Sequence, residues 1–285
     1  MLLITGATGK VGRAAGKALS ESGIPFRVLV RDPQRLSLPP SESIQVAVGD
    51  LSSPKTLETA LEGVNCALLV TGNSESQEVQ ERNFIDAAAS CGVSRVVKIS
   101  SMEASPTTTA VLPKLHYDIE QHTKASGMAW TFLQPNFFMQ NLLMYAEPIG
   151  KAGVFALPFG NAKAALIDVK DIGAVCAKVL QEEGHDNATY QLTGSTLQSF
   201  HDVAACFSDC LGKEVKYIPQ SAEEFRGVLS NFIHSTWHLD ALCELFAQIE
   251  AGALENTTDH VKQLLGHSPR SLKDFIVDHK AVFEG

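Results

Sequence analysis

Hydrophobic and polar positions follow two alternating rhythms through the first half of the chain. Short apolar runs typical of buried strands alternate with longer stretches in which apolar residues recur at helical spacing. The expected strands are residues 1–5, 26–30, 44–48, 66–70, 96–99 and 130–133, and the expected helices are 13–22, 55–61, 77–91 and 115–126. Strands that alternate with helices predict an α/β fold, a doubly wound parallel Rossmann sheet covered on both faces.

The second half of the chain has a different pattern. The expected helices are 136–145, 169–180, 200–211, 222–232, 239–249 and 261–265, with a loop or hairpin at 151–160 and one more strand at 190–192. We therefore expect residues 1–150 to form the sheet domain, which also receives segments from about 160–195. Residues 151–285 should form a smaller, mostly helical lobe on the substrate side.

A glycine-rich turn follows the first strand. Gly6, Gly9 and Gly12 have the spacing Gly-x-x-Gly-x-x-Gly. In this pattern the first glycine permits the tight turn, the second lets the backbone approach a pyrophosphate, and the third lets the helix pack closely. The helix N-terminus offers free N–H groups to phosphate. The pattern predicts a dinucleotide site, and a purely structural turn is the alternative.

The end of the second strand indicates which dinucleotide binds. Arg31 and Asp32 follow that strand about 20 residues after the glycines, where the ribose 2′ substituent is read. The Arg31 guanidinium can form a bidentate contact with a 2′-phosphate, and Arg35 could assist. NADP(H) is therefore favoured over NAD(H), although Asp32 keeps NAD(H) open.

Bulk properties restrict the partners. A net charge of −9 over 285 residues argues against nucleic acid. Six scattered cysteines without Cys-x-x-Cys spacing are typical of reduced thiols in a cytoplasmic protein. The first strand leaves no room for a signal peptide, and no apolar stretch approaches the length of a membrane span. We expect no nucleic-acid partner and no membrane, and a homodimer stays open.

These motifs, in this order, resemble the NmrA-like family of atypical short-chain dehydrogenases, with its quinone-reductase and triphenylmethane-reductase relatives. The resemblance rests on residues 6–12, 30–32, 49–51, 96–101, 116–120, 134–141, 167–173 and 269–275. It implies NADP(H) binding, with Asp50 and Leu51 near adenine, Thr71 and Gly72 near the adenosine ribose, and Pro135–Phe138 near nicotinamide. The expected cofactor-binding residues are Gly6, Thr8, Gly9, Lys10, Val11, Gly12, Arg31, Asp50, Leu51, Thr71, Gly72, Pro135, Asn136, Phe137 and Phe138.

One departure from typical short-chain dehydrogenases concerns catalysis. Those enzymes carry Tyr-x-x-x-Lys on the helix after the fifth strand, whereas here Gln121 stands four residues after Tyr117. His116 and Glu120 instead share one helical face. We expect His116 to donate a proton near neutral pH, oriented by Glu120. The alternative is that the pair only shapes the pocket.

Other candidates are weaker. Cys206 and Cys210 share a helical face near His201, but two buried thiols explain them better than a metal, so no metal site is expected. His234 and His238 are expected to line the core or a pocket around Trp237. An aromatic pocket beside nicotinamide and ordinary core packing are both open for Phe137, Phe138, Met139, Met144 and Tyr145. Two lysines, Lys98 and Lys114, are expected to be solvated, although Lys114 lies close enough in sequence to His116 to reach the site.

Two functions compete. The first is NADPH-dependent reduction of a quinone, a dye or another conjugated small-molecule acceptor, in which the cofactor carries the chemistry and the protein positions it. The second is an NADP(H)-binding redox sensor that acts through a protein partner without turnover. Sugar-nucleotide epimerisation is disfavoured because that chemistry normally needs the missing tyrosine.

Overall fold

Contacts within the chain divide it into two compact units. The computed structural model describes residues 1–38 and 41–285. The first, here called the sheet unit, contains residues 1–106, 115–134 and 169–190. The second, the helical unit, contains residues 107–114, 135–168 and 191–285. As expected, the sheet unit receives a segment from within 160–195, here 169–190, but residues 135–150 belong to the helical unit. The functional assignment of the domains stays a prediction.

A seven-stranded sheet, in the order β3-β2-β1-β4-β5-β6-β9, forms the centre of the fold. Its strands are β1 (Leu2–Ile4), β2 (Phe26–Val30), β3 (Ile44–Val48), β4 (Cys66–Leu69), β5 (Arg95–Ile99), β6 (Ala129–Pro135) and β9 (Ala188–Leu192). The pairs from β3 through to β6 are parallel. The chain starts in the middle and winds outward in both directions, which confirms the predicted Rossmann sheet. The strand order reverses between β1 and β4, where such sheets bind ligands.

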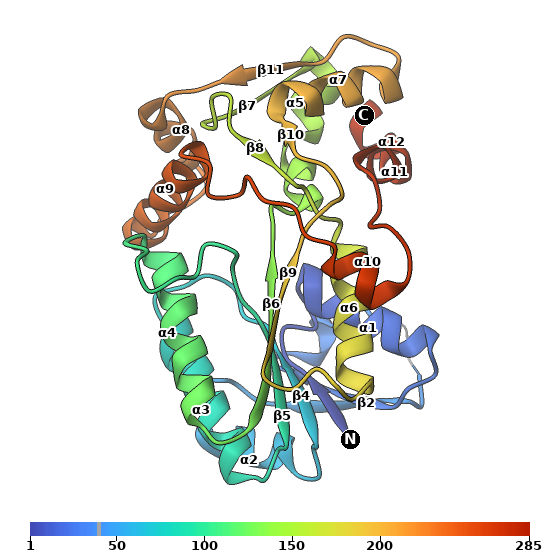
Figure 1. Ribbon diagram of the computed structural model, residues 1–285, viewed down its shortest axis with the longest axis vertical. Coiled ribbons are helices and arrows are strands. Elements are labelled where there is room, and N and C mark those ends of the chain that lie inside the picture. The colour runs from blue at the N-terminus through green and yellow to red at the C-terminus, as the bar shows by residue number, and fades with distance from the viewer. Residues whose placement is uncertain (39–40) are drawn as a thin grey trace. The chain divides into compact units, whose positions relative to one another are not determined.

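Helices cover both faces of this sheet (Figure 1). They are α1 (Lys10–Glu21), α2 (Pro54–Leu61), α3 (Gln77–Ser90), α4 (Val111–Ala125) and α6 (Val169–Gln181), with the short 3₁₀ helix η1 (Pro33–Arg35) after β2. Figure 1 shows α1 and α6 on one face and α2, α3 and α4 on the other. On the second face, buried Phe84 and Ile119 join the strand residue Val96 in one hydrophobic cluster.

The crossing of α1 and α6 fixes the helix that follows the glycine turn. A Cβ atom on Gly173 would lie 2.6 Å from the backbone carbon of Ala14, so the two helix backbones are nearly in contact. Any larger residue at position 173 would push α1 away. The N-terminus of α1 is therefore held by a tightly packed helix pair.

The helical unit is built around aromatic side chains. Its helices are η2 (Met139–Tyr145), α5 (Ala146–Ala152), α7 (Phe200–Leu211), α8 (Ala222–Leu229), α9 (Thr236–Glu250), α10 (His260–Leu265), α11 (Leu272–Asp278) and α12 (Lys280–Glu284). Two small sheets pair β7 (Val154–Leu157) with β11 (Lys216–Pro219) and β8 (Lys163–Ala164) with β10 (Gln198–Ser199). Phe159 and Phe200 pack with ring centroids 4.8 Å apart. The expected helix 136–145 starts only at Met139, because Phe138 forms an extended bridge with Ile167.

No helix in the described part of the chain is long and apolar enough to cross a membrane.

Candidate active site

The glycine turn adopts a backbone that its first glycine makes possible. Gly6 has φ of +63°, and a Cβ atom on it would lie 2.6 Å from the carbonyl oxygen of Val70. The amide of Gly9 donates to the carbonyl oxygen of Gly6 at 2.9 Å, which closes the turn. Both the left-handed conformation and the lack of space exclude a side chain at position 6.

Gly9 and Gly12 differ in the space around them. A Cβ atom on Gly12 would lie 2.3 Å from the carbonyl oxygen of Gly6, so this glycine is required by packing. A Cβ atom on Gly9 would have that same oxygen, at 3.3 Å, as its one neighbour within 4 Å in the described structure. Gly9 is the N-cap of α1, and no side chain caps the helix there. Gly9 is exposed, and the first-turn N–H groups of α1 beside it are groups of the kind that bind phosphate.

The end of β2 favours a phosphorylated ribose. The Arg31 side chain is exposed and makes no hydrogen bond or ion pair to any residue in the described ranges. The Asp32 carboxylate accepts from the backbone N–H of Gln34 at 2.9 Å and caps η1. The guanidinium is therefore available to a 2′-phosphate, whereas the carboxylate is already engaged with the backbone.

The residues expected near adenine and its ribose follow β3 and β4. Asp50 accepts from the backbone N–H of Ser52 at 2.7 Å, and Leu51 packs against the hydrophobic cluster around Phe84. Gly72 is exposed, with open space around its Cα. Parallel strands bring these positions to the same edge of the sheet as the glycine turn.

A buried polar network lies behind this edge. The hydroxyl group of Thr71 donates to Oε1 of Glu81 at 2.5 Å, and the amide of Gln77 donates to the same oxygen at 2.9 Å. The ammonium group of Lys98 donates to Oε2 of Glu81 at 2.6 Å. Lys98 is completely buried and Glu81 nearly so, which makes this an internal ion pair.

The expectation that Lys98 is solvated is therefore wrong. Lys98 lies on β5 between Val97 and Ile99, within a run that is apolar apart from the lysine itself. Central parallel strands are buried on both faces, so a lysine in such a run needs an internal partner. That pattern is the sequence signal that could have identified Lys98 as a site residue.

The surroundings of His116 also differ from expectation. Nδ1 of His116 lies 3.2 Å from Nζ of Lys98, whereas the expected partner was Glu120. Burial and the nearby Lys98 charge hold the pKa of His116 well below its usual range. The expectation that His116 titrates near neutrality is therefore wrong, because the sequence did not reveal the cation beside it.

Glu120, one turn further along α4, has different partners. Its Oε1 accepts from the hydroxyl group of Ser100 at 2.6 Å and from the amide of Gln134 at 2.9 Å. Glu120 is almost fully buried. Glu120 therefore links the ends of β5 and β6 to α4 by hydrogen bonds. His116 and Glu120 lie on the same helix but contact different residues.

The segment expected near nicotinamide belongs to the helical unit. Asn136 is buried, donates to the carbonyl oxygen of Leu254 at 3.0 Å and accepts from the backbone N–H of Phe137 at 2.7 Å. The ring of Phe137 packs edge-on against Phe159 and Phe200 in the aromatic core. Within the segment Pro135–Phe138, Phe138 alone keeps a half-exposed side chain.

The sequence as a whole matches the NmrA-like family over residues 1–276. The chain belongs to the NmrA-like family. It is 35% identical to the NAD(P)H azoreductase of Xenophilus azovorans over 99% of both chains, and 28% identical to quinone oxidoreductase 2 of Escherichia coli over 97% of both.

Solved structures agree with this membership. The NADPH complex of the NADPH-dependent quinone oxidoreductase from Escherichia coli has a TM-score of 0.89 and 28% identity, and covers 99% of this chain and 100% of its own. The NADP(H) complex of Citrobacter sp. triphenylmethane reductase has a TM-score of 0.86 at 23% identity, covering 98% and 99% of the two chains, and supports the fold. The predicted resemblance to this family is confirmed.

The weaker candidates of this NmrA-like protein, at positions 201, 206, 210, 234 and 238, belong to the helical unit. Cys206 and Cys210 are only half-buried, and burial together with the neighbouring Cys210 raises the pKa of Cys206 to about 12. Among residues 1–38 and 41–285, no three His, Cys, Asp or Glu side chains are grouped to hold a metal ion. His201 packs against the ring of Tyr217, while His234 is exposed and His238 half-buried.

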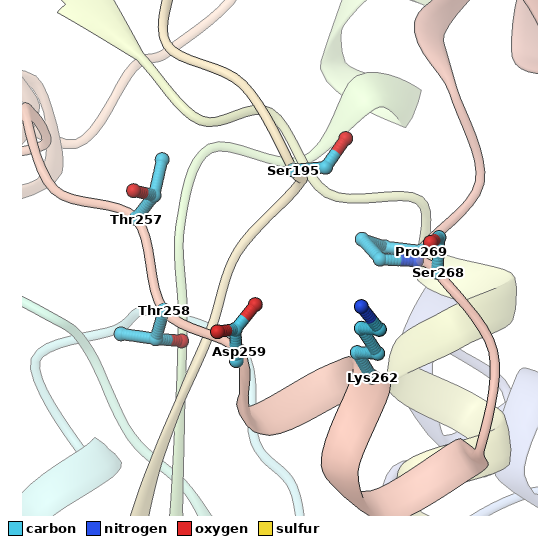
Figure 2. Close-up of a pocket in the computed structure, with 7 residues that line it drawn as sticks. All are labelled: Ser195, Thr257, Thr258, Asp259, Lys262, Ser268 and Pro269. Carbon is cyan, nitrogen blue, oxygen red and sulfur yellow. The ribbon is translucent and has the colours of Figure 1, made fainter.

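The helical unit of the NmrA-like chain also contains a polar pocket (Figure 2). Figure 2 shows Lys262 and Asp259 of the α10 region together with Ser195 and Ser268 from neighbouring loops. Its volume of about 210 Å³ is below the roughly 300 Å³ at which pockets begin to hold drug-sized ligands. This pocket therefore fits neither a dinucleotide nor a dye.

Proposed function

We propose that this NmrA-like protein is an NADPH-dependent reductase of quinones, azo dyes or other conjugated small-molecule acceptors. Membership of the family and the names of its relatives support the enzyme class. Two observations carry the proposal. No side chain caps the N-terminus of α1 at Gly9. Arg31, which follows β2, makes no hydrogen bond or ion pair within the described residues.

The cofactor residues have separable tasks. The first-turn N–H groups of α1 would hold the pyrophosphate, and Arg31 would hold the 2′-phosphate. Gly72 leaves space for the adenosine ribose, while Asp50 and Leu51 form the rim expected at adenine. NADPH, when bound, supplies the hydride.

We assign the acceptor side of the site to His116. Its Nδ1 is used by Lys98, while Nε2 has no hydrogen-bond partner within the described residues and the side chain is only half-buried. Nε2–H can therefore donate to an oxygen or nitrogen atom of the acceptor on which negative charge develops. Glu120 supports this site by holding Ser100 and Gln134 in place.

Turnover with a panel of acceptors tests the proposal. Purified protein is mixed with NADPH and, separately, with a benzoquinone, a naphthoquinone, an azo dye and a triphenylmethane dye. We expect NADPH oxidation with at least one acceptor class and much weaker oxidation of NADH. Tight NADPH binding without reduction of any acceptor would contradict the proposal and favour the redox sensor.

A further inference from the structure

Lys98 makes three polar contacts inside the sheet unit. Its ammonium group donates to Glu81 at 2.6 Å and to the carbonyl oxygen of Ile99 at 3.1 Å, and it lies 3.2 Å from Nδ1 of His116. An ammonium group has three N–H donors and no acceptor. The three neighbours thus account for all of its donors.

Glu81 is the ion-pair partner of Lys98. One carboxylate oxygen of Glu81 accepts hydrogen bonds from Thr71 and Gln77, and the other accepts one from Lys98. All three contacts donate to the carboxylate, which is the arrangement of an ionised carboxyl group. A carboxylate that is itself satisfied on both oxygens stabilises the buried ammonium opposite it.

The direction of the Lys98–His116 hydrogen bond fixes the imidazole. Because the ammonium group can only donate, Nδ1 of His116 accepts. A neutral imidazole that accepts at Nδ1 carries its proton on Nε2. Burial and, after it, the Lys98 charge hold the pKa of His116 well below its usual range, so the ring is neutral at neutral pH.

The charged groups around His116 come from three elements. Lys98 of β5 contacts the ring, Glu81 of α3 pairs with Lys98, and Glu120 of α4 is held by Ser100 and Gln134. Lys98 is the charge that acts on the imidazole. No carboxylate in the described part of the chain accepts a hydrogen bond from the His116 ring, so nothing opposes the effect of Lys98.

We propose that Lys98 is a positioning residue, whose ammonium group holds His116 in the Nε2–H tautomer and so presents a neutral hydrogen-bond donor to the acceptor. This inference rests on the proposed role of His116. A neutral imidazole can stabilise a developing negative charge by donating a hydrogen bond while itself remaining uncharged. Lys98 is itself held in place by its ion pair with Glu81 of α3, so the orientation of His116 also depends on Glu81.

A neutral His116 that donates a hydrogen bond and an imidazolium that acts as a general acid should differ in their dependence on pH. A ring that is neutral already at neutral pH does not change charge between about pH 6 and 8. The donor strength of His116 is then constant over that range. Removing the Lys98 charge frees Nδ1 and removes one of the two causes that lower the pKa of the ring, while burial remains.

The ring state can be measured directly by long-range proton–nitrogen NMR of protein labelled with ¹⁵N-histidine. The chain has 9 histidines, so His116→Gln assigns the signal. The test variant is Lys98→Met with Glu81→Gln, since losing Lys98 alone would leave Glu81 as an unpaired buried charge. Lys124→Met is the matched control, because it removes an exposed lysine that packs over Trp130.

We expect the wild type and Lys124→Met to show the Nε2–H tautomer without titration between about pH 6 and 8. In the double variant the ring should lose that tautomer preference, and its pKa should rise because the Lys98 charge is gone. Turnover should fall roughly tenfold or more. An Nδ1–H tautomer in the wild type, or an unchanged ring in the double variant, would overturn the inference. Because the NMR readout needs no acceptor, failure of the proposed reductase activity would be seen separately.

Discussion

The two glycines at the start of α1 should respond to substitution in opposite ways. In Gly12→Ala the new methyl group would lie 2.3 Å from the Gly6 carbonyl oxygen, a backbone atom that no side-chain rotation can move away. Overpacking of this kind costs roughly 1–3 kcal/mol or more, and alanine regains only about 1 kcal/mol in helix propensity. The strands, the turn and α1 must then shift.

Gly9→Val should leave the fold almost intact. Its Cβ would lie 3.3 Å from that same oxygen, and the backbone at φ of −90° and ψ of 179° suits a β-branched residue. The side chain would instead occupy the face that a pyrophosphate approaches. We expect the Kd for NADPH to rise at least 100-fold, or about 2.7 kcal/mol.

Two assays on both variants distinguish these effects. Thermal unfolding should show a Tm drop of several degrees for Gly12→Ala and a change of about 1 °C or less for Gly9→Val. Calorimetric titration with NADPH should show the binding loss in folded Gly9→Val. The reasoning is refuted if Gly9→Val binds NADPH like the wild type, or if Gly12→Ala unfolds at the wild-type temperature.

Three other substitutions test separate parts of the site. Arg31→Ala should weaken NADPH by roughly 10- to 100-fold and leave NADH unchanged, since a charge-assisted contact contributes about 1.5–3 kcal/mol; equal calorimetric losses for both cofactors would count against the 2′-phosphate assignment. His116→Ala should lower kcat roughly 100-fold with little change in the Kd for NADPH; full activity in this variant would remove His116 from the acceptor side. Glu120→Gln should lower the Tm, because the hydrogen bonds from Ser100 and Gln134 then reach a neutral amide; an unchanged Tm would show that the Glu120 charge does not stabilise this junction.

Local pattern was sufficient for the sheet and for the position of the glycine turn. β2 and β3 begin and end where the apolar runs predict, and α7 covers the expected 200–211. Each of these elements is defined by its own sequence period and by residues at its ends. Ser199, for example, caps α7 by accepting from the backbone N–H of Asp202.

Long-range pairing and internal charge were not predictable in the same way. β7 was expected as part of a loop or hairpin, but it pairs with β11, more than fifty residues further along the chain. The sequence predicts Glu120 as the partner of His116, because two residues four positions apart on one helix can be recognised as neighbours from sequence alone. The actual partner, Lys98, comes from strand β5, and burial of the ring together with the Lys98 charge lowers the pKa of His116.

The central claim is that this chain holds NADPH and passes its hydride to a conjugated acceptor. A single-turnover stopped-flow experiment tests it most directly: protein loaded with NADPH, or with NADPH deuterated at the transferring position, is mixed with the best quinone or azo acceptor. The account predicts that NADPH absorbance disappears in step with acceptor reduction, and that deuterium slows the step by a primary isotope effect. Bound NADPH that persists in the presence of every acceptor would contradict the claim.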